Sequence, residues 1–234
     1  MNPLPLFSQL HHGILATIVL FCICIPLLGK NLSENKANSL AVRLAIFIIS
    51  LEVFLFIYRH AMGIFDPTRN YPLHLCSLAE FCTAYALITK NQRAFELSFY
   101  WGFAASTQAL LTPHLDGYKL FDIQFIIFFI SHGLIILNVI WLIIVDKMKI
   151  RSSSLFETFL ISNLILMPIG FINWIGNANY MYLRSKPPVE NPLLMGDWPF
   201  YILGFEVIAI TFFSILFIIM KLLNKVIIIS EKKG

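Results

Sequence analysis

The apolar positions of this chain occur in long unbroken runs rather than in amphipathic stripes. Seven runs, mostly of about twenty residues, are separated by short polar segments, and they cover roughly 12–29, 41–60, 72–89, 95–112, 122–145, 155–177 and 200–220. Because a helix rises about 1.5 Å per residue, each run crosses or nearly crosses a hydrocarbon layer about 30 Å thick. The pattern predicts an all-α, polytopic transmembrane helical bundle of about seven spans, forming one domain over 1–234.

Composition supports lipid as the solvent of this chain. Of its 234 residues, 58% are hydrophobic and only 13% are charged, whereas a soluble domain carries roughly a quarter charged residues. The net charge of +4 does not indicate a nucleic-acid partner, because the basic residues lie at the ends of the apolar runs. The first run lacks a basic leader and a small-residue cleavage site, so we expect it to be a retained span.

The basic residues are distributed unevenly between the two sides of the predicted bundle. The first, third and fifth loops and the C-terminal tail hold 12 of the 17 Lys and Arg residues, and the opposite side holds the other 5. Short cytoplasmic loops carry an excess of Lys and Arg. The split predicts a cytoplasmic C-terminus and, with an odd number of spans, an extracytoplasmic N-terminus, in the cell membrane.

Polar side chains inside the spans are the candidates for function, because burying them in hydrocarbon costs a few kcal/mol each. With the predicted sidedness, five spans bring polar groups to the outer half of the bundle, and the inner half is almost purely apolar. This asymmetry predicts a polar cavity that opens outward. The polar candidates within the spans are Glu52, His74, Glu80, Gln108, His132, Asn138, Asn163, Asn173 and Glu206. The residues expected to line or orient the cavity, beside Cys76 and His132, are His74, Glu80, Gln108, Glu52, Asn173, Asn177 and Glu206.

Cys76 is the candidate nucleophile of that cavity. Pro72 suits the first position of a helix, which would put Cys76 one turn into a helix whose dipole favours a thiolate. His132, on another span, is a better base for the thiol than His74, since residues two apart point to different helix faces. The expected depths of Cys76 and His132 differ by more than one turn, which helix tilt or a ragged helix start would have to absorb.

Simpler interpretations compete with this one. A buried cysteine is commonly a small apolar packing residue, and Cys22, Cys24 and Cys82 are interpreted in this way. An intramembrane histidine or glutamate can be a structural hydrogen-bond partner. The cysteines lack the spacing of metal ligands, and neither a metal nor a cofactor is expected.

Five short motifs resemble one family of membrane proteins. They are Pro72–Leu73–His74–Leu75–Cys76–Ser77; Trp101–Gly102 with Gln108–Ala109–Leu110–Leu111–Thr112–Pro113; Ser131–His132–Gly133–Leu134–Ile135; Asn177–Ala178–Asn179–Tyr180–Met181–Tyr182–Leu183; and Gly196–Asp197–Trp198–Pro199. In this order they resemble the YwaF-like family of bacterial integral membrane proteins, which is related to the eukaryotic transmembrane protein 164 family.

The resemblance implies lipid chemistry. The eukaryotic relatives are acyltransferases that act on ether phospholipids through an essential cysteine, and a more distant group of membrane hydrolases uses a threonine and a histidine. The cysteine falls on Cys76 and the histidine on His132. We therefore expect an acyltransferase or hydrolase of membrane lipids, with Glu80 or Glu52 as an orienting group and oxyanion donors from Gln108, Asn173 or Asn177.

A binding or transport protein without covalent chemistry is the alternative. In that case Glu52, Glu80, His132 and Glu206 would bind a small solute or couple its movement to protons. The absence of an inverted repeat and of polar residues in the inner half argues against transport. A structural subunit of a larger complex is a third interpretation, for which the sequence offers no specific support.

Overall fold

The structure is a computed structural model that describes residues 3–115, 117–187 and 196–231, with side chains up to residue 224. Over these residues it contains helices and no strand, which confirms the all-α prediction. The helices are α1 (Gln9–Gly29), α2 (Glu34–Ala61), α3 (Leu75–Thr89), α4 (Gln92–Trp101), the π-helix η1 (Gly102–Ser106), α5 (Thr107–Leu111), α6 (Ile123–Ile144), α7 (Ser154–Gly176), the short 3-10 helix η2 (Tyr180–Tyr182) and α8 (Phe200–Glu231).

Five of these helices, α1, α2, α6, α7 and α8, are long and apolar enough to cross a membrane. The predicted span 95–112 corresponds to α4, η1 and α5, which follow one another without a break from Gln92 to Leu111. The predicted span 72–89 is shorter than expected, because α3 begins only at Leu75. The placement of Pro72 in the first turn of this helix was therefore wrong, and Pro72 lies in the loop before it.

The chain divides into two compact units. Unit 1 comprises Met1–Phe65 and Leu75–Met148, and so holds α1 to α6. Unit 2 comprises Asp66–His74 and Lys149–Gly234, and so holds α7, η2 and α8 together with the loop that precedes α3. Folding as one domain stays a prediction. Of the prolines in the predicted outer loop 178–199, Pro188 and Pro192 lie outside the described residues.

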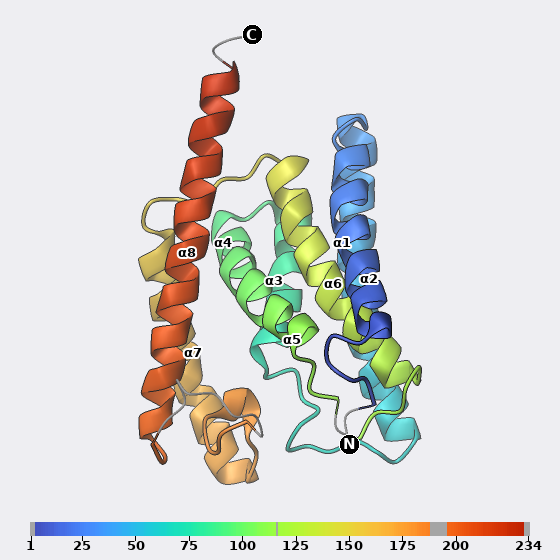
Figure 1. Ribbon diagram of the computed structural model, residues 1–234, viewed down its shortest axis with the longest axis vertical. Helices are drawn as coiled ribbons and strands as arrows, with labels where there is room; N and C mark the ends of the chain where they lie inside the picture. Colours follow the sequence, from blue (N-terminus) through green and yellow to red (C-terminus); the bar gives the residue numbers. More distant parts are fainter. Residues whose placement is uncertain (1–2, 116, 188–195, 232–234) are drawn as a thin grey trace. The chain divides into compact units, whose positions relative to one another are not determined.

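Unit 1 is organised around α6, which α1, α2, α3, α4, η1 and α5 all contact (Figure 1). Small residues allow the close approach of its neighbours. A Cβ atom added to Gly102 would lie 2.9 Å from Ile135 Cγ2, and one added to Gly29 would lie 2.5 Å from Trp141 Cη2. Trp141 is fully buried, so its ring has little freedom to move away.

Side-chain caps determine where the helices of unit 1 begin. Asp122 accepts a hydrogen bond from Phe125 N at 2.7 Å, which satisfies a free amide at the start of α6. Ser8 and Asn91 cap α1 and α4 in the same way. His11 then joins α1 to the end of α5, because its Nε2 lies 2.8 Å from Leu110 O. The start of α6 is therefore fixed nine residues before His132.

The tight contact at Gly29 can be tested with a matched pair of glycines on α1. We expect Gly29→Ala to lower the stability of the protein by about 1–3 kcal/mol, because the added methyl group would overlap the Trp141 ring. Gly13 has no atom within 4 Å of its added Cβ, so Gly13→Ala should be neutral or stabilising. Thermal unfolding followed by circular dichroism in one detergent compares the two. Equal midpoints would contradict the packing described here.

Candidate functional site

Two carboxyl groups from neighbouring helices meet inside unit 1. Glu52 on α2 and Glu80 on α3 lie within hydrogen-bonding reach of each other, and the Glu80 carboxyl also reaches Ser131 on α6. Glu80 is only 3% exposed. Its Oε2 atom has no hydrogen-bond partner among the described residues. A buried polar atom without a partner is rare in proteins and points to a place for water or a ligand.

His132 lies on α6, beside the residue that contacts Glu80. Its Nδ1 is 2.7 Å from Phe128 O, and its ring lies 4.3 Å, centroid to centroid, from the Phe128 ring. A carbonyl oxygen only accepts hydrogen bonds, so Nδ1 carries the proton and Nε2 of the neutral ring carries the lone pair. Nε2 has no hydrogen-bond partner in the described part of the chain. A backbone carbonyl therefore orients this imidazole, in the role that Glu80 or Glu52 was expected to fill.

Cys76 is the second residue of α3 and is partly buried. Glu80 follows it by four residues and so lies on the same helix face, one turn further along. The carboxyl group is close enough to affect the thiol electrostatically. No hydrogen bond joins Cys76 to His132 in the part of the chain that the structure describes.

The neighbours of Glu80 and His132 relate the positions of the two groups along the helices. The contact between Glu80 and Ser131 sets the register of α3 against α6. From that level, Cys76 lies one turn toward the start of α3, about 6 Å along its axis. The bond to the Phe128 carbonyl also draws the His132 ring toward the start of α6. Both groups are displaced in the same direction, because α3 and α6 run parallel.

The π-helix affects which side chain of the fourth predicted span is buried inside unit 1. Ser106, the last residue of η1, is fully buried, and its Oγ has no partner among the described residues. Gln108 is exposed and donates to Thr112 Oγ1 at 2.6 Å. The expectation that Gln108 faces the cavity was therefore wrong. π-bulges are frequent at functional sites and change the helix face that a residue occupies.

An apolar groove of about 360 Å³ runs along unit 1 between α1, α5 and α6. Ile136 and Ile140 of α6 line it, and they follow His132 by one and two turns on the same side of the helix. The other lining residues are Leu15, Ile18, Val19, Cys22, Ile23, Thr107, Leu110 and Leu111. The groove offers apolar side chains almost throughout, and its α6 residues begin one turn after His132.

The opposite ends of the unit 1 helices also bury polar side chains. Asn138 is fully buried and its amide has no partner among the described residues. Glu96 is 2% exposed and accepts a hydrogen bond from Gln92 at 2.8 Å. The expectation of an almost purely apolar inner half was therefore wrong for unit 1.

Sequence reasoning missed two polar residues of unit 1, Ser131 and Arg59. Ser131 was passed over although it stands next to His132 in the sequence. Arg59 was counted only as one of the five basic residues on the outer side. It donates to Gln124 Oε1 at 2.9 Å and to Tyr118 OH at 3.3 Å. Its place on the side where basic residues are scarce was the signal that could have singled it out.

The amide residues expected to donate to an oxyanion have structural roles in unit 2. Asn173 is buried and exchanges two hydrogen bonds with the backbone of Tyr180, one from Tyr180 N at 2.8 Å and one to Tyr180 O at 2.9 Å. Asn177 ends α7 in the left-handed conformation, with φ of 53°, and accepts a hydrogen bond from Arg184. Both residues shape the turn that follows α7.

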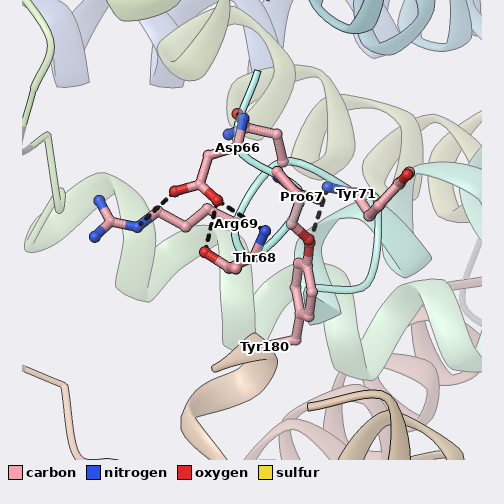
Figure 2. Close-up of polar contacts among 7 residues, drawn as sticks. Asp66, Pro67, Thr68, Arg69, Tyr71 and Tyr180 are labelled. Atoms are coloured by element: carbon pink, nitrogen blue, oxygen red, sulfur yellow. Dashed lines mark hydrogen bonds and ion pairs between the residues drawn. The ribbon is translucent and has the colours of Figure 1, made fainter. Parts of the chain in front are cut away.

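Tyr180 connects this turn to the loop before α3 (Figure 2). Its hydroxyl donates to Pro67 O at 2.6 Å and accepts from Tyr71 N at 3.1 Å. His74 belongs to the same arrangement, since its Nδ1 is 3.5 Å from Met181 N and its ring is 5.1 Å from that of Tyr180. The His74 ring therefore has structural neighbours within unit 2.

Glu206 on α8 has a partner on α7. Asn163 Nδ2 donates to Glu206 Oε2 at 3.0 Å and also to Phe159 O at 3.1 Å. This pair joins the two long helices of unit 2. A single cavity shared by the unit 1 residues and by Glu206, Asn173 and Asn177 stays a prediction. Across the described residues, no three His, Cys, Asp or Glu side chains are grouped so that they could hold a metal ion.

Comparison with known proteins gives one match. The profile described as the TMEM164 family matches residues 6–217, which is most of the chain. No curated protein matches the chain, and no solved structure does.

The structural role of the Tyr180 hydroxyl can be tested by replacing Tyr180 with phenylalanine, which removes only that hydroxyl group. We expect Tyr180→Phe to destabilise unit 2 by about 1–3 kcal/mol, because Pro67 O and Tyr71 N would lose their partner. Hydrogen exchange at the Tyr71 amide should become faster. Tyr85→Phe is the control, since Tyr85 is 55% exposed and its hydroxyl makes no hydrogen bond in the described structure. Unchanged exchange at Tyr71 would contradict this role.

The loop before α3 also makes a prediction about pH. Hydrogen bonds from the Thr68 hydroxyl at 2.6 Å and the Thr68 amide at 2.8 Å hold the pKa of Asp66 below its ordinary value. The resulting stabilisation is fully present above the ordinary Asp pKa of about 3.9 and is lost as the pH falls through the lowered value. We expect Thr68→Val to raise the pKa of Asp66, measured by carboxyl-carbon NMR. An unchanged pKa would show that Thr68 has no such effect.

Proposed function

This chain belongs to the TMEM164 family of membrane proteins, and from that premise we propose that it is a lipid acyltransferase or lipid hydrolase embedded in the cell membrane. Cys76 is the nucleophile and His132 the general base. The substrate is an acyl ester of a membrane lipid, and the chain belongs to the YwaF-like bacterial branch of the family.

The orientation of His132 is the observation that carries this proposal. A general base needs an unprotonated nitrogen at the reaction site. The bond from Nδ1 to Phe128 O leaves the lone pair on Nε2, and Nε2 has no partner among the described residues. An ordinary structural histidine in a membrane helix would be expected to use both nitrogens, since hydrocarbon offers no water as a substitute.

The proposed reaction proceeds in two steps. In the first, His132 Nε2 takes the proton of the Cys76 thiol, the sulfur attacks the ester carbonyl, and the protonated imidazole returns that proton to the departing alcohol oxygen. The acyl group is then held as a thioester. In the second, water or a lipid alcohol attacks the thioester, His132 takes its proton, and the sulfur leaves and is reprotonated.

The surroundings supply the remaining requirements. The Ser106 hydroxyl has a free hydrogen, and we assign it the oxyanion role in place of Gln108. The apolar groove that begins one turn after His132 accommodates the acyl chain. A water molecule takes up about 30 Å³ in the liquid, and a methylene group is similar in size. The groove volume of about 360 Å³ therefore corresponds to roughly twelve methylene groups.

A binding or transport protein is the second candidate. The buried pair Glu52 and Glu80 favours it, because side-by-side carboxyls in a membrane are typical of proton or ligand sites. Asn138, buried without a partner, supplies a polar group in the half of unit 1 that was expected to be apolar. In this case Cys76 makes no covalent bond to a ligand.

The enzyme is tested with purified variants in lipid nanodiscs that contain a phospholipid with a fluorescent acyl chain. We expect Cys76→Ala and His132→Ala each to lower acyl release or transfer by at least about 100-fold, because each removes a group that forms or breaks a bond. Cys82→Ala is the matched control, since Cys82 is another cysteine of α3 and should be dispensable. An acyl thioester on Cys76 should be detectable by mass spectrometry and released by hydroxylamine.

Two results separate the candidates. Turnover like that of the unmodified protein in both variants would end the enzyme proposal. The binding or transport protein is correct if two results are obtained together. No lipid ester is turned over, and a ligand that still binds to the Cys76→Ala variant no longer binds to the Glu80→Gln variant.

A further inference from the structure

Arg59 lies two residues before the end of α2 and is half-buried in unit 1. Its guanidinium is held at two points, with Nε donating to Gln124 Oε1 at 2.9 Å and Nη2 donating to Tyr118 OH at 3.3 Å. Gln124 is the second residue of α6 and Tyr118 belongs to the loop before it. The side chain therefore spans from one helix to the next in a defined geometry.

Both partners of Arg59 are neutral, and within the part of the chain that the structure describes no ion pair cancels its positive charge. Two other cations of the protein do form ion pairs. Arg151 Nη2 lies 2.7 Å from Glu157 Oε2, and Lys90 Nζ lies 2.6 Å from Asp146 Oδ2. Glu52 attracts Arg59 only through space, from two turns away on the same helix. A guanidinium has five N–H groups, and the described contacts of Arg59 use two of them. The remaining donors are available to an anion.

The position of Arg59 along the bundle relates it to Cys76. Arg59 follows Glu52 by seven residues, or about 10 Å along α2. Glu80 lies beside Glu52, and Cys76 precedes Glu80 by one turn, or about 6 Å. Because α2 and α3 run antiparallel, both displacements point to the same end of unit 1. Cys76 is therefore about 4 Å deeper than Arg59 along the helix axes.

We propose that Arg59, positioned by Gln124 and Tyr118, binds the phosphodiester group of a phospholipid whose ester carbonyl reaches Cys76. The inference rests on the proposed function, and it assigns the residue that binds the lipid headgroup. In a glycerophospholipid only the glycerol carbons separate the phosphate from the ester, a few ångströms, which matches the offset in depth. The planar guanidinium offers paired N–H groups to two phosphate oxygens, and the half-buried site strengthens this attraction.

Binding is measured first, without turnover, in protein carrying Cys76→Ala. The probes are a dialkyl phosphatidylcholine, which has a phosphate but no ester, the corresponding dialkylglycerol, and inorganic phosphate. We expect Arg59→Gln to weaken binding of the phospholipid by about ten- to a hundredfold and to leave the dialkylglycerol unchanged. Arg69→Gln is the matched control, because Arg69 is exposed and paired with Asp66 at 3.5 Å.

A second pair of variants separates the effect of the position of the Arg59 guanidinium from the effect of its charge. Gln124→Leu and Tyr118→Phe keep Arg59 but release its guanidinium, and each should weaken phospholipid binding by less than Arg59→Gln does. Arg59→Lys retains the charge without the planar fork and should also be intermediate. Equal thermal unfolding midpoints for all variants would show that the effects do not come from misfolding. If the midpoint of Arg59→Gln falls, Gln124→Leu and Tyr118→Phe decide the test.

Turnover by protein with Cys76 intact gives an independent readout. Arg59→Gln should raise the KM for a diacyl phospholipid by at least about tenfold and leave kcat/KM for a neutral diacylglycerol unchanged. Equal effects on both lipids, or no effect on either, would overturn the headgroup site. Inorganic phosphate that binds to Arg59 as tightly as the phospholipid would identify a site for a free anion instead.

The two proposals fail in different ways. If Cys76→Ala turns lipid over normally while Arg59→Gln still weakens dialkyl phosphatidylcholine binding, the enzyme proposal fails and the headgroup site stands. If Cys76→Ala abolishes turnover while Arg59→Gln leaves phospholipid binding and KM unchanged, the headgroup site fails and the enzyme proposal stands.

Discussion

Hydrocarbon contains no partner for a hydrogen bond, and this constraint explains most of the polar side chains that the helices bury. Thr83 and Ser98 donate back to carbonyls of their own helices, Ala79 O at 2.5 Å and Ala94 O at 2.6 Å. Asn173 uses the Tyr180 backbone in the same way, and Asn163 uses Glu206. These groups are satisfied locally and connect neighbouring segments. They need no functional explanation.

The polar atoms that remain unsatisfied have a different distribution. Within the described residues, the buried atoms without a partner are Glu80 Oε2, Ser106 Oγ, both amide atoms of Asn138 and Trp141 Nε1, and all belong to unit 1. Leaving such a group unpaired costs roughly 1–3 kcal/mol, so a fold keeps it only where water or a ligand completes it. These atoms mark the interior of unit 1, around α6, as the place where water or a ligand binds.

The role of α6 follows from its position at the centre of unit 1. Its side chains serve three purposes: Ser131 meets the carboxyl of Glu80, His132 is held by its own backbone, and Ile136 and Ile140 line the apolar groove. Gly133, on another face, lets Ile18 of α1 approach to 3.1 Å of where its Cβ would lie. One rigid helix thus holds the base, the carboxyl contact and the groove in a fixed register. A reaction that needs these groups together depends on that rigidity.

The sequence alone determined the all-helical membrane architecture, because the length of an apolar run and the cost of burying charge are local properties. It also identified Cys76, His132 and Glu80 by residue type. The tertiary structure decided their partners: the Phe128 carbonyl for His132, Ser131 and Glu52 for Glu80, and Gln124 and Tyr118 for Arg59. It moved Gln108 to the surface and Ser106 inward through a π-helix, and it engaged Asn173 and Asn177 in a turn. Rotation and register between helices depend on packing across the bundle, and no single span encodes them.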